Sequence, residues 1–303
     1  MLYSSEAYAR GMWPRVNAYY SKTYLGFDMP LHQHENAEVM YVFSGECAVD
    51  VESDGEPAQA HVMRAGDFIF LNARVRHRLS VAGDAQCTML NVEFTLAPAG
   101  GMFTLSQLRA DSPDYAWFVA LGRDWCAGSD LRGELFKAMD ALVSGLEADR
   151  DATALRRAEM AILLMRLSRA VREGLQKPGA TLYVRRAAGF IRQSHTRPLT
   201  LGQVAARAGV SQGYLARLFR AETGQTIAGY IERVRLEHAA VLLERSRLSV
   251  ADIAAQVGFG TRQRFGAAFR RRYGLAPGEY RIKRRANRYP QVQRRVLEYP
   301  PGE

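Results

Sequence analysis

The sequence LTLGQVAARAGVSQGYLARLFRAETG occupies residues 199–224 of this 303-residue chain, and a related sequence, LSVADIAAQVGFGTRQRFGAAFRRRYG, occupies residues 248–274. In each stretch, a Ser or Thr followed three positions later by Gln or Asp predicts a capped helix start. A glycine then predicts a tight turn. Two apolar residues four positions apart predict that a second helix packs against a core. Each stretch therefore predicts a helix-turn-helix unit.

The same three signals recur in both units. They are the capping pairs Thr200/Gln203 and Ser249/Asp252, the turn residues Gly209 and Gly258, and the core pairs Leu215/Phe219 and Phe265/Phe269. With those core pairs buried, the opposite face of each second helix is left for a partner. That face consists of Gln212, Gly213, Arg217 and Arg220 in the first unit, and of Arg262, Gln263, Ala267 and Arg270 in the second.

The segment between the two units, residues 227–245, can form one 19-residue helix of about 28 Å. Successive turns of one face of DNA are about 34 Å apart. A helix of this length could therefore hold two recognition helices over adjacent segments of the major groove. We predict that the eight exposed residues face double-stranded DNA.

Charge supports this prediction because it is distributed unevenly. The chain has a net charge of +10, but residues 1–178 carry −5 and residues 179–303 carry +15. A strongly basic half joined to a mildly acidic half indicates that the basic half binds a polyanion.

The stretch from Thr200 to Arg281 resembles the DNA-binding domain of the AraC family of transcriptional regulators. The resemblance is carried by SQGYLARLFRAETGQ, IERVRLEHAAVLL, IAAQVGFGTRQRFGAAFRRRYGLAP and GEYR. It implies that one monomer binds two successive major-groove segments, and that an activator of this type would also contact RNA polymerase. Gly213 and Ala267 stand where relatives often present larger side chains, so base recognition is expected to depend more on Arg217, Arg262 and Gln263.

The N-terminal part has a different pattern. Short apolar runs between Asn17 and Thr95 predict antiparallel strands in a sandwich or barrel, separated by turns that include SGE at residues 44–46 and AGD at residues 82–84. The segment GFDMPLHQHENAEVMYVFSG, residues 26–45, resembles the first cupin motif at every fixed position. Gly66-Asp67 and His77 resemble part of the second motif, in which Asn72 replaces the usual proline.

His32, His34 and Glu38 have even spacing, so on an extended strand they share one face, and a barrel could bring His77 alongside. Three interpretations stay open. The four residues could hold a divalent metal such as Zn, Fe, Mn or Ni. They could form a metal-free polar floor that contacts a small-molecule effector, or they could have no ligand. We expect an organic effector, a sugar or other small polar metabolite, because Asn72 interrupts the second motif just before His77.

The predicted fold class is α+β, with four regions along the chain. Residues 1–100 form a cupin-like effector-binding barrel with an N-terminal arm, and residues 101–178 form a helical connector with helices expected at residues 113–121, 131–146 and 153–175. Residues 179–285 form an all-α DNA-binding domain, and residues 286–303 a basic tail. The connector helix at residues 153–175 carries two apolar stripes, one with Leu155 and Ile162 and the other with Leu164 and Val171, so we expect it to form a homodimer.

Other classes find less support. No apolar run is long enough to span a membrane, the first residues lack a signal-peptide pattern, and the three cysteines are widely spaced. We therefore expect a cytoplasmic protein that is not an enzyme: a transcriptional regulator controlled by a small molecule. The alternative is a metal-dependent cupin enzyme in which the four pocket residues are catalytic and the helical half is auxiliary.

Overall fold

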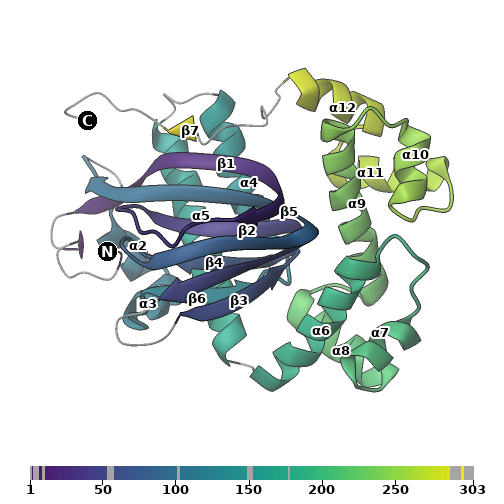
Figure 1. Cartoon of the computed structure of the whole chain (residues 1–303), viewed down its shortest axis with the longest axis horizontal. Coiled ribbons are helices and arrows are strands. Elements are labelled where there is room, and N and C mark those ends of the chain that lie inside the picture. The colour runs from purple at the N-terminus through teal and green to yellow at the C-terminus, as the bar shows by residue number, and fades with distance from the viewer. Residues whose placement is uncertain are drawn as a thin grey trace. The chain divides into compact units, whose positions relative to one another are not determined.

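The computed structural model describes residues 2, 7–8, 11–52, 58–100, 103–148, 153–176, 178–286 and 295–296. The chain divides into two compact units (Figure 1). The first contains Met1–Lys177 together with Gln291–Glu303, and the second contains Pro178–Pro290. Each unit is described by itself.

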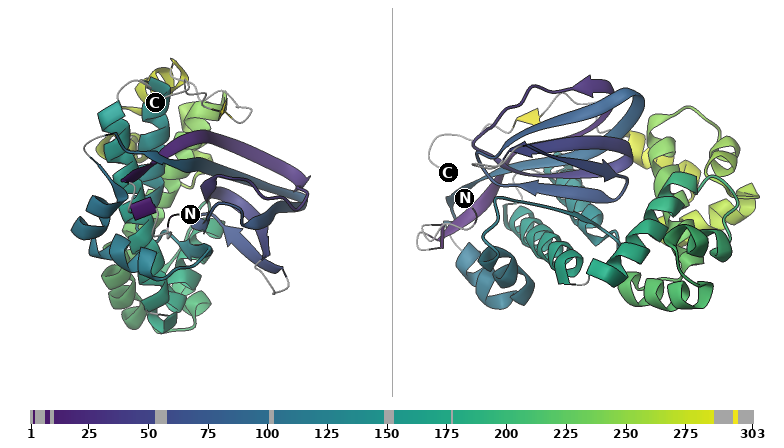
Figure 2. Two further views of the ribbon diagram at one scale, coloured as in Figure 1. Left: turned by 90° about the vertical axis from the view of Figure 1, so that its left-hand side faces the viewer. Right: turned by 60° about the horizontal axis from the view of Figure 1, so that its bottom comes forward.

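The first unit is built on one seven-stranded antiparallel sheet. Its strands are β1 (Met12–Asp28), β2 (Ala37–Glu52), β3 (Gln59–Arg64), β4 (Asp67–Leu71), β5 (Arg76–Pro98), β6 (Trp125–Ser129) and β7 (Arg295–Val296). The strand order is β6-β4-β2-β5-β1-β7, and β3 also pairs with β2. Because β1, β2 and β5 are long and strongly bent, the sheet folds over its own inner face (Figure 2).

That inner face encloses an apolar core. The core includes Met40 and Val42 of β2, Met63 of β3, Ile69 of β4 and Met89 of β5, all nearly inaccessible to solvent. Side chains alternate between the two faces of a strand, so Glu38 lies on the same inner face as Met40. The predicted barrel is confirmed, and its inner face is where the sequence placed the cupin residues.

Two predicted turns are wrong. The sequence suggested turns at residues 44–46 and 82–84, whereas β2 and β5 run through both segments. Irregular pairing between Gly45 and Ala48 absorbs the extra residues of β5 as a bulge. A Cβ on Gly45, whose φ is +82°, would meet the Gln86 carbonyl, so only glycine fits this bulge.

Four described helices follow or flank the strands. They are α2 (Leu105–Asp111), α3 (Pro113–Ala120), α4 (Glu134–Ala148) and α5 (Thr153–Gln176). The sequence predicted the last three within a few residues. It did not predict α2, nor β6, which is only five residues long and pairs at the sheet edge with β4.

The second unit is entirely helical. Its helices are α6 (Pro178–Ser194), α7 (Leu201–Ala208), α8 (Gln212–Thr223), α9 (Ile227–Arg245), α10 (Val250–Gln256), α11 (Arg262–Tyr273) and α12 (Pro277–Ala286). Both predicted capping boxes are present, at Thr200/Gln203 and at Ser249/Asp252. The single helix predicted between the two units is α9, with the predicted bounds.

Each helix-turn-helix unit is fixed by the burial of two apolar side chains on its second helix. Leu215 and Phe219 of α8, and Phe265 and Phe269 of α11, are all fully buried, as predicted. Truncating one of these phenylalanines to alanine would cost about 3–5 kcal/mol of unfolding free energy.

Little of the predicted basic tail can be compared with the structure. Ala286 ends α12, and Arg295–Val296 pairs with β1 at Ala18 and Tyr19. The other residues of 286–303 lie outside the described part. None of the described helices is long and apolar enough to cross a membrane.

Candidate functional site

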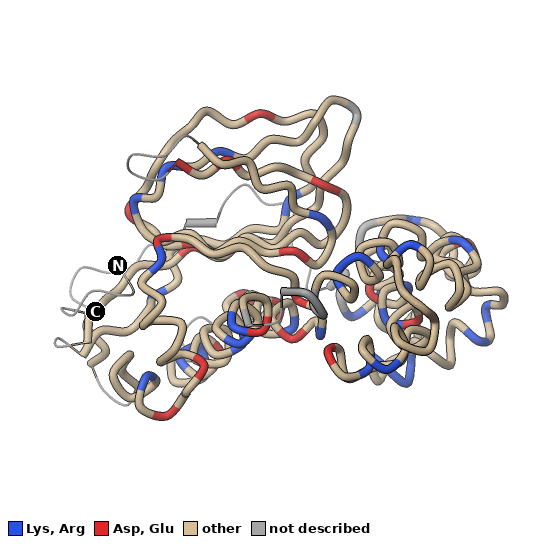
Figure 3. The backbone as a smooth tube through the Cα atoms, turned by 90° about the horizontal axis from the view of Figure 1, so that it is seen from below, with Lys and Arg blue, Asp and Glu red and all other residues tan. Residues whose placement is uncertain are grey.

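The second unit presents two recognition helices, α8 and α11, with one polar face each. All eight residues predicted to face DNA are exposed: Gln212, Gly213, Arg217, Arg220, Arg262, Gln263, Ala267 and Arg270. Arginines therefore lie along the outward faces of both helices. Figure 3 shows how Lys and Arg outnumber Asp and Glu on this unit. Contact of the eight residues with DNA stays a prediction.

The segment between α6 and α7 holds the two helix-turn-helix units together. Arg235 of α9 donates from Nε to the His195 carbonyl at 2.7 Å and from Nη2 to the Arg197 carbonyl at 2.9 Å. The same segment lies against the turn of the second helix-turn-helix, because a Cβ on Gly258 would be 2.9 Å from the carbonyl oxygens of both His195 and Thr196.

A histidine pair reinforces this contact. His195 Nδ1 lies 2.7 Å from the Arg192 carbonyl and therefore carries a proton, so His195 Nε2 accepts from His238 Nδ1 at 3.0 Å. Burial, followed by the nearby His195, lowers the pKa of His238 to about 4. Both rings are consequently neutral at neutral pH, and sequence patterns gave no sign of the pair.

In the first unit, the structure brings the four predicted pocket residues together. One ring nitrogen each from His32, His34 and His77 lie within 4.8 Å of one another. The Glu38 Oε1 atom is 2.7 Å from His77 Nε2 and 3.4 Å from His34 Nε2. Asn72 in the second motif therefore does not turn His77 away from the other three residues.

Backbone carbonyls fix the orientation of all three imidazole rings. His32 Nδ1 lies 3.1 Å from the Pro30 carbonyl, His34 Nδ1 is 2.9 Å from that of Asn36, and His77 Nδ1 is 2.9 Å from that of Val75.

A carbonyl only accepts, so each Nδ1 carries the proton, and in the neutral ring each Nε2 keeps a lone pair. His77 Nε2 and Glu38 Oε1 are buried, close and not aligned for a hydrogen bond with each other. A ring nitrogen with a free lone pair and a carboxylate oxygen are both atoms that bind a divalent cation directly.

Glu38 is a buried carboxylate, only 1% exposed. Burial by itself would raise its pKa, but contacts with His34 and His77 outweigh burial and hold the pKa of Glu38 far below its usual range. The pairing with Glu38 in turn raises the pKa of His34. The carboxylate contribution to stability is thus present at neutral pH and is lost only in strong acid, whereas that of His34 is lost as pH rises through its elevated pKa.

Two polar residues that sequence analysis missed complete this site. Asn91 Nδ2 donates to Glu38 Oε2 at 2.8 Å and also to the Tyr20 hydroxyl at 2.7 Å. Asn91 reaches Glu38 because β2 and β5 are neighbours, with Asn91 opposite Met40. No motif marks either residue, and only the strand register reveals them.

Comparison with known proteins agrees with both halves of this description. A family profile described as a helix-turn-helix domain matches residues 204–283, and one described as a cupin domain matches residues 25–93. The regulatory protein SoxS of Escherichia coli K12 is 40% identical over 85 residues, which cover 28% of this chain and 79% of SoxS. The chain belongs to the AraC family of transcriptional regulators.

Further similarities lie in the DNA-binding half of this AraC-family regulator. The transcriptional activator RhaR of Klebsiella pneumoniae is 37% identical over 93 residues, 31% of this chain and 33% of RhaR. The C-terminal domain of AraT from Geobacillus stearothermophilus is 36% identical, with coverage of 34% and 85% and a TM-score of 0.33. The DNA-binding domain of AdpA, solved with a target DNA, is 30% identical, with coverage of 35% and 95% and a TM-score of 0.34.

Replacing Gly258 tests the contact between the two helix-turn-helix units. Gly258→Ala places a Cβ against two carbonyl oxygens at a φ of +87°, so it should lower the stability of the second unit by more than about 1 kcal/mol. Gly209→Ala is the matched control, because Gly209 has a similar φ of +79° but a Cβ there meets no heavy atom within 4 Å. Thermal unfolding of both variants checks the prediction, and equal melting temperatures would contradict it.

Proposed function

We propose that this AraC-family regulator couples a small polar effector, bound in the barrel, to the occupancy of a two-part DNA site. The observation that carries the proposal is the pair of exposed, arginine-bearing faces on α8 and α11, each held by a fully buried aromatic core. A difference of about 1–3 kcal/mol in effector affinity between two states of the regulator would change DNA occupancy several-fold. Such a protein acts in the cytoplasm and contacts RNA polymerase if it activates transcription.

We infer further that the four-residue cluster serves binding and not catalysis. The alternative, a metal-dependent cupin enzyme, would need a general acid, base or nucleophile placed beside the cluster. Among the described residues, Glu38 is contacted by the two histidines, which already compensate its charge, and by Asn91, whose amide cannot transfer a proton at neutral pH. Membership of a family of transcriptional regulators favours the binding role.

The DNA proposal separates two arginines by function. Arg217 lies one turn into α8 on the exposed face, so Arg217→Ala should cost about 1–3 kcal/mol of specific binding and relax preference at one base pair. Arg270 lies in the last turn of α11, so Arg270→Ala should weaken binding to all sequences alike and reduce the salt slope by about one unit.

Gel shifts at three salt concentrations, on a site selected from random DNA, distinguish the two effects. Unchanged affinity and specificity of the Arg217→Ala protein would remove Arg217 from base recognition. An unchanged salt slope for Arg270→Ala would remove Arg270 from the phosphate contacts.

We propose that His32, His34, Glu38 and His77 hold a divalent cation, to which oxygen atoms of the effector then bind. Support comes from the fixed tautomers, which leave the Nε2 atoms of His34 and His77 within 3.4 Å of the carboxylate, and from the buried His77 Nε2 and Glu38 Oε1, which have no hydrogen-bond partner among the described residues. Asn91 would orient Glu38 as an outer hydrogen-bond partner. A bound cation would supply positive charge for polar oxygen ligands. An organic effector that touches the four residues directly is the competing proposal.

Elemental analysis of protein purified without a nickel column or chelator should find close to one metal per chain. Because protons compete for the same Nε2 atoms, affinity for the metal should fall as pH drops through the histidine range. His34→Ala should abolish the metal content, whereas His61→Ala, a histidine outside the cluster, should leave it unchanged. Trace metal only, in both wild type and the His61→Ala control, would favour the metal-free effector site.

We also propose that the regulator is a homodimer through α5. Most of one predicted stripe is buried within the first unit, as Leu164 and Val171 show, and only Leu175 at its C-terminal end is largely exposed, at 43%. The other is not covered there: Leu155 is 53% exposed and Ile162 is 44% exposed. An aliphatic stripe of this kind on a 24-residue helix fits a second copy of the same helix.

Sedimentation equilibrium tests the dimer. The wild-type chain should sediment as a dimer and Ile162→Glu as a monomer, because a charge would be buried at the contact. Leu175→Glu is the control, since Leu175 is equally exposed but belongs to the other stripe. A monomeric wild type, or a dimeric Ile162→Glu protein, would refute the proposed contact.

A further inference from the structure

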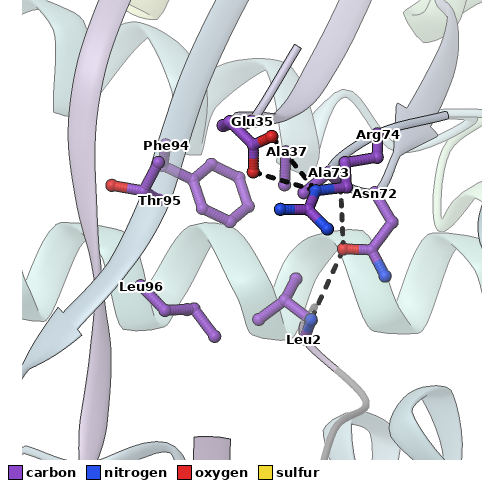
Figure 4. A pocket seen from close by; sticks show the side chains of 9 residues that line it. All are labelled: Leu2, Glu35, Ala37, Asn72, Ala73, Arg74, Phe94, Thr95 and Leu96. Atoms are coloured by element: carbon purple, nitrogen blue, oxygen red, sulfur yellow. Dashed lines mark hydrogen bonds and ion pairs between the residues drawn. The ribbon is translucent and has the colours of Figure 1, made fainter. Parts of the chain in front are cut away.

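The first unit contains a cavity of about 390 Å³, whose lining includes none of the histidine cluster (Figure 4). Phe94, Leu96 and Leu2 supply apolar walls, and Glu35 and Arg74 lie at its rim. This volume lies within the range of small-molecule sites, about 300–1,000 Å³.

The cavity lies on the opposite face of the sheet from the cluster. Ala37 lines the cavity while its neighbour Glu38 belongs to the cluster, and adjacent residues of a strand point to opposite faces. Phe94 pairs directly with Ala37 across β2 and β5, which places it on the same outer face. A ligand here would therefore occupy a site distinct from the one proposed above.

Arg74 has a backbone conformation that is unfavourable for a residue with a Cβ atom. Its φ is +69°, the only positive value at a non-glycine residue in the described part of the chain. It is the third residue of the turn between β4 and β5, closed by Val75 N–H donating to the Asn72 carbonyl at 3.3 Å. Glycine or asparagine normally occupies a turn position of this kind. Strain of this kind persists only where the surrounding structure imposes it, and it is concentrated at functional sites.

The Arg74 side chain is only partly engaged. Its Nε donates to both carboxylate oxygens of Glu35, at 3.1 and 3.0 Å, while its two terminal nitrogens have no partner among the described residues. Figure 4 shows the guanidinium reaching from the turn toward Phe94, with Glu35 on one side and Leu2 on the other. An exposed ion pair thus stands at the entrance to an apolar space.

The floor of the cavity is fixed by Asn72. This residue is buried, and its Oδ1 accepts from the backbone N–H groups of Leu2 at 3.4 Å and Ala73 at 3.0 Å. It thereby joins the N-terminal segment to the turn that carries Arg74. Asn72 is the same residue that departs from the second cupin motif, so this departure has a structural role at the cavity.

We propose that this cavity binds a zwitterionic amino acid with an apolar side chain. The guanidinium of Arg74 would pair with the ligand carboxylate, Glu35 with its ammonium group, and Phe94 and Leu96 with its side chain. A simple carboxylate would face the like charge of Glu35, and a simple amine would face that of Arg74. A zwitterion satisfies both partners and keeps the site neutral.

A backbone hydrogen bond and one peptide bond connect the residues at the rim of the cavity with the histidine cluster. Arg74 N–H donates to the His34 carbonyl at 2.8 Å, and Glu35 directly follows His34. The proposal itself does not depend on the metal or on the effector proposed for the barrel.

Calorimetric titration of the full-length protein tests the site, with L-leucine and L-phenylalanine as probes. The matched controls are 4-methylpentanoate, which lacks the amino group of leucine, and 3-methylbutylamine, which lacks its carboxylate. Both controls should bind at least about tenfold more weakly than leucine. Glu35→Gln should weaken leucine binding and strengthen binding of 4-methylpentanoate, a reversal that a general loss of structure would not produce.

Arg74→Gly separates the ligand role from folding. Glycine relieves the positive φ, so this variant should melt no lower than wild type while losing leucine binding. His34→Ala should still bind leucine, which keeps this test independent of the metal proposal. The proposal would be overturned if neither amino acid binds at concentrations on the order of 10 mM, if the controls bind as well as leucine, or if Arg74→Gly binds leucine normally.

Discussion

The DNA-binding unit depends on His195, Thr196 and Arg197, which follow α6 and precede the first helix-turn-helix. Arg235 of α9 donates to the carbonyls of His195 and Arg197, and the turn at Gly258 of the second helix-turn-helix lies against the carbonyls of His195 and Thr196. Because these contacts tie both α9 and the turn at Gly258 to one short backbone segment, they restrict rotation of one recognition helix relative to the other. Two recognition helices that moved independently would add little to each other's affinity for DNA, whereas two helices held in a fixed relation bind DNA as a single ligand.

In the first unit, the comparable constraint is the burial of Glu38. The negative charge of a carboxylate that is almost fully inaccessible must be compensated. His34 and His77 can carry positive charge beside it, and Asn91 donates a hydrogen bond to it. On the proposed function, a metal or an effector oxygen in the cluster would change this compensation. The residues around Glu38 would then both hold the barrel together and respond to a ligand.

Local signals were sufficient to predict most of the helical half from sequence. Capping pairs such as Thr200/Gln203 and buried pairs such as Leu215/Phe219 lie within one helical turn, so their meaning does not require knowledge of the fold. The cupin quartet was identified by its spacing, and the structure brings it together.

The remaining features depend on pairings between distant residues. The bulge at Gly45 was taken for a turn because only the Gln86 carbonyl opposite it reveals that the strand continues. Asn91 is assigned to the site by the register of β5 on β2, and the strain at Arg74 by its backbone angle. The contact of His195 with His238 joins residues 43 positions apart and has no counterpart in a periodic pattern.

The central claim is that two recognition helices, held in fixed relation, contact two successive major-groove segments. Hydroxyl-radical footprinting on a DNA site selected by the full-length protein measures this directly. The account predicts two protected patches on one face of the duplex, about one helical turn apart, for each protein chain bound. A single protected patch per chain, or two patches whose separation varies among selected sites, would contradict it.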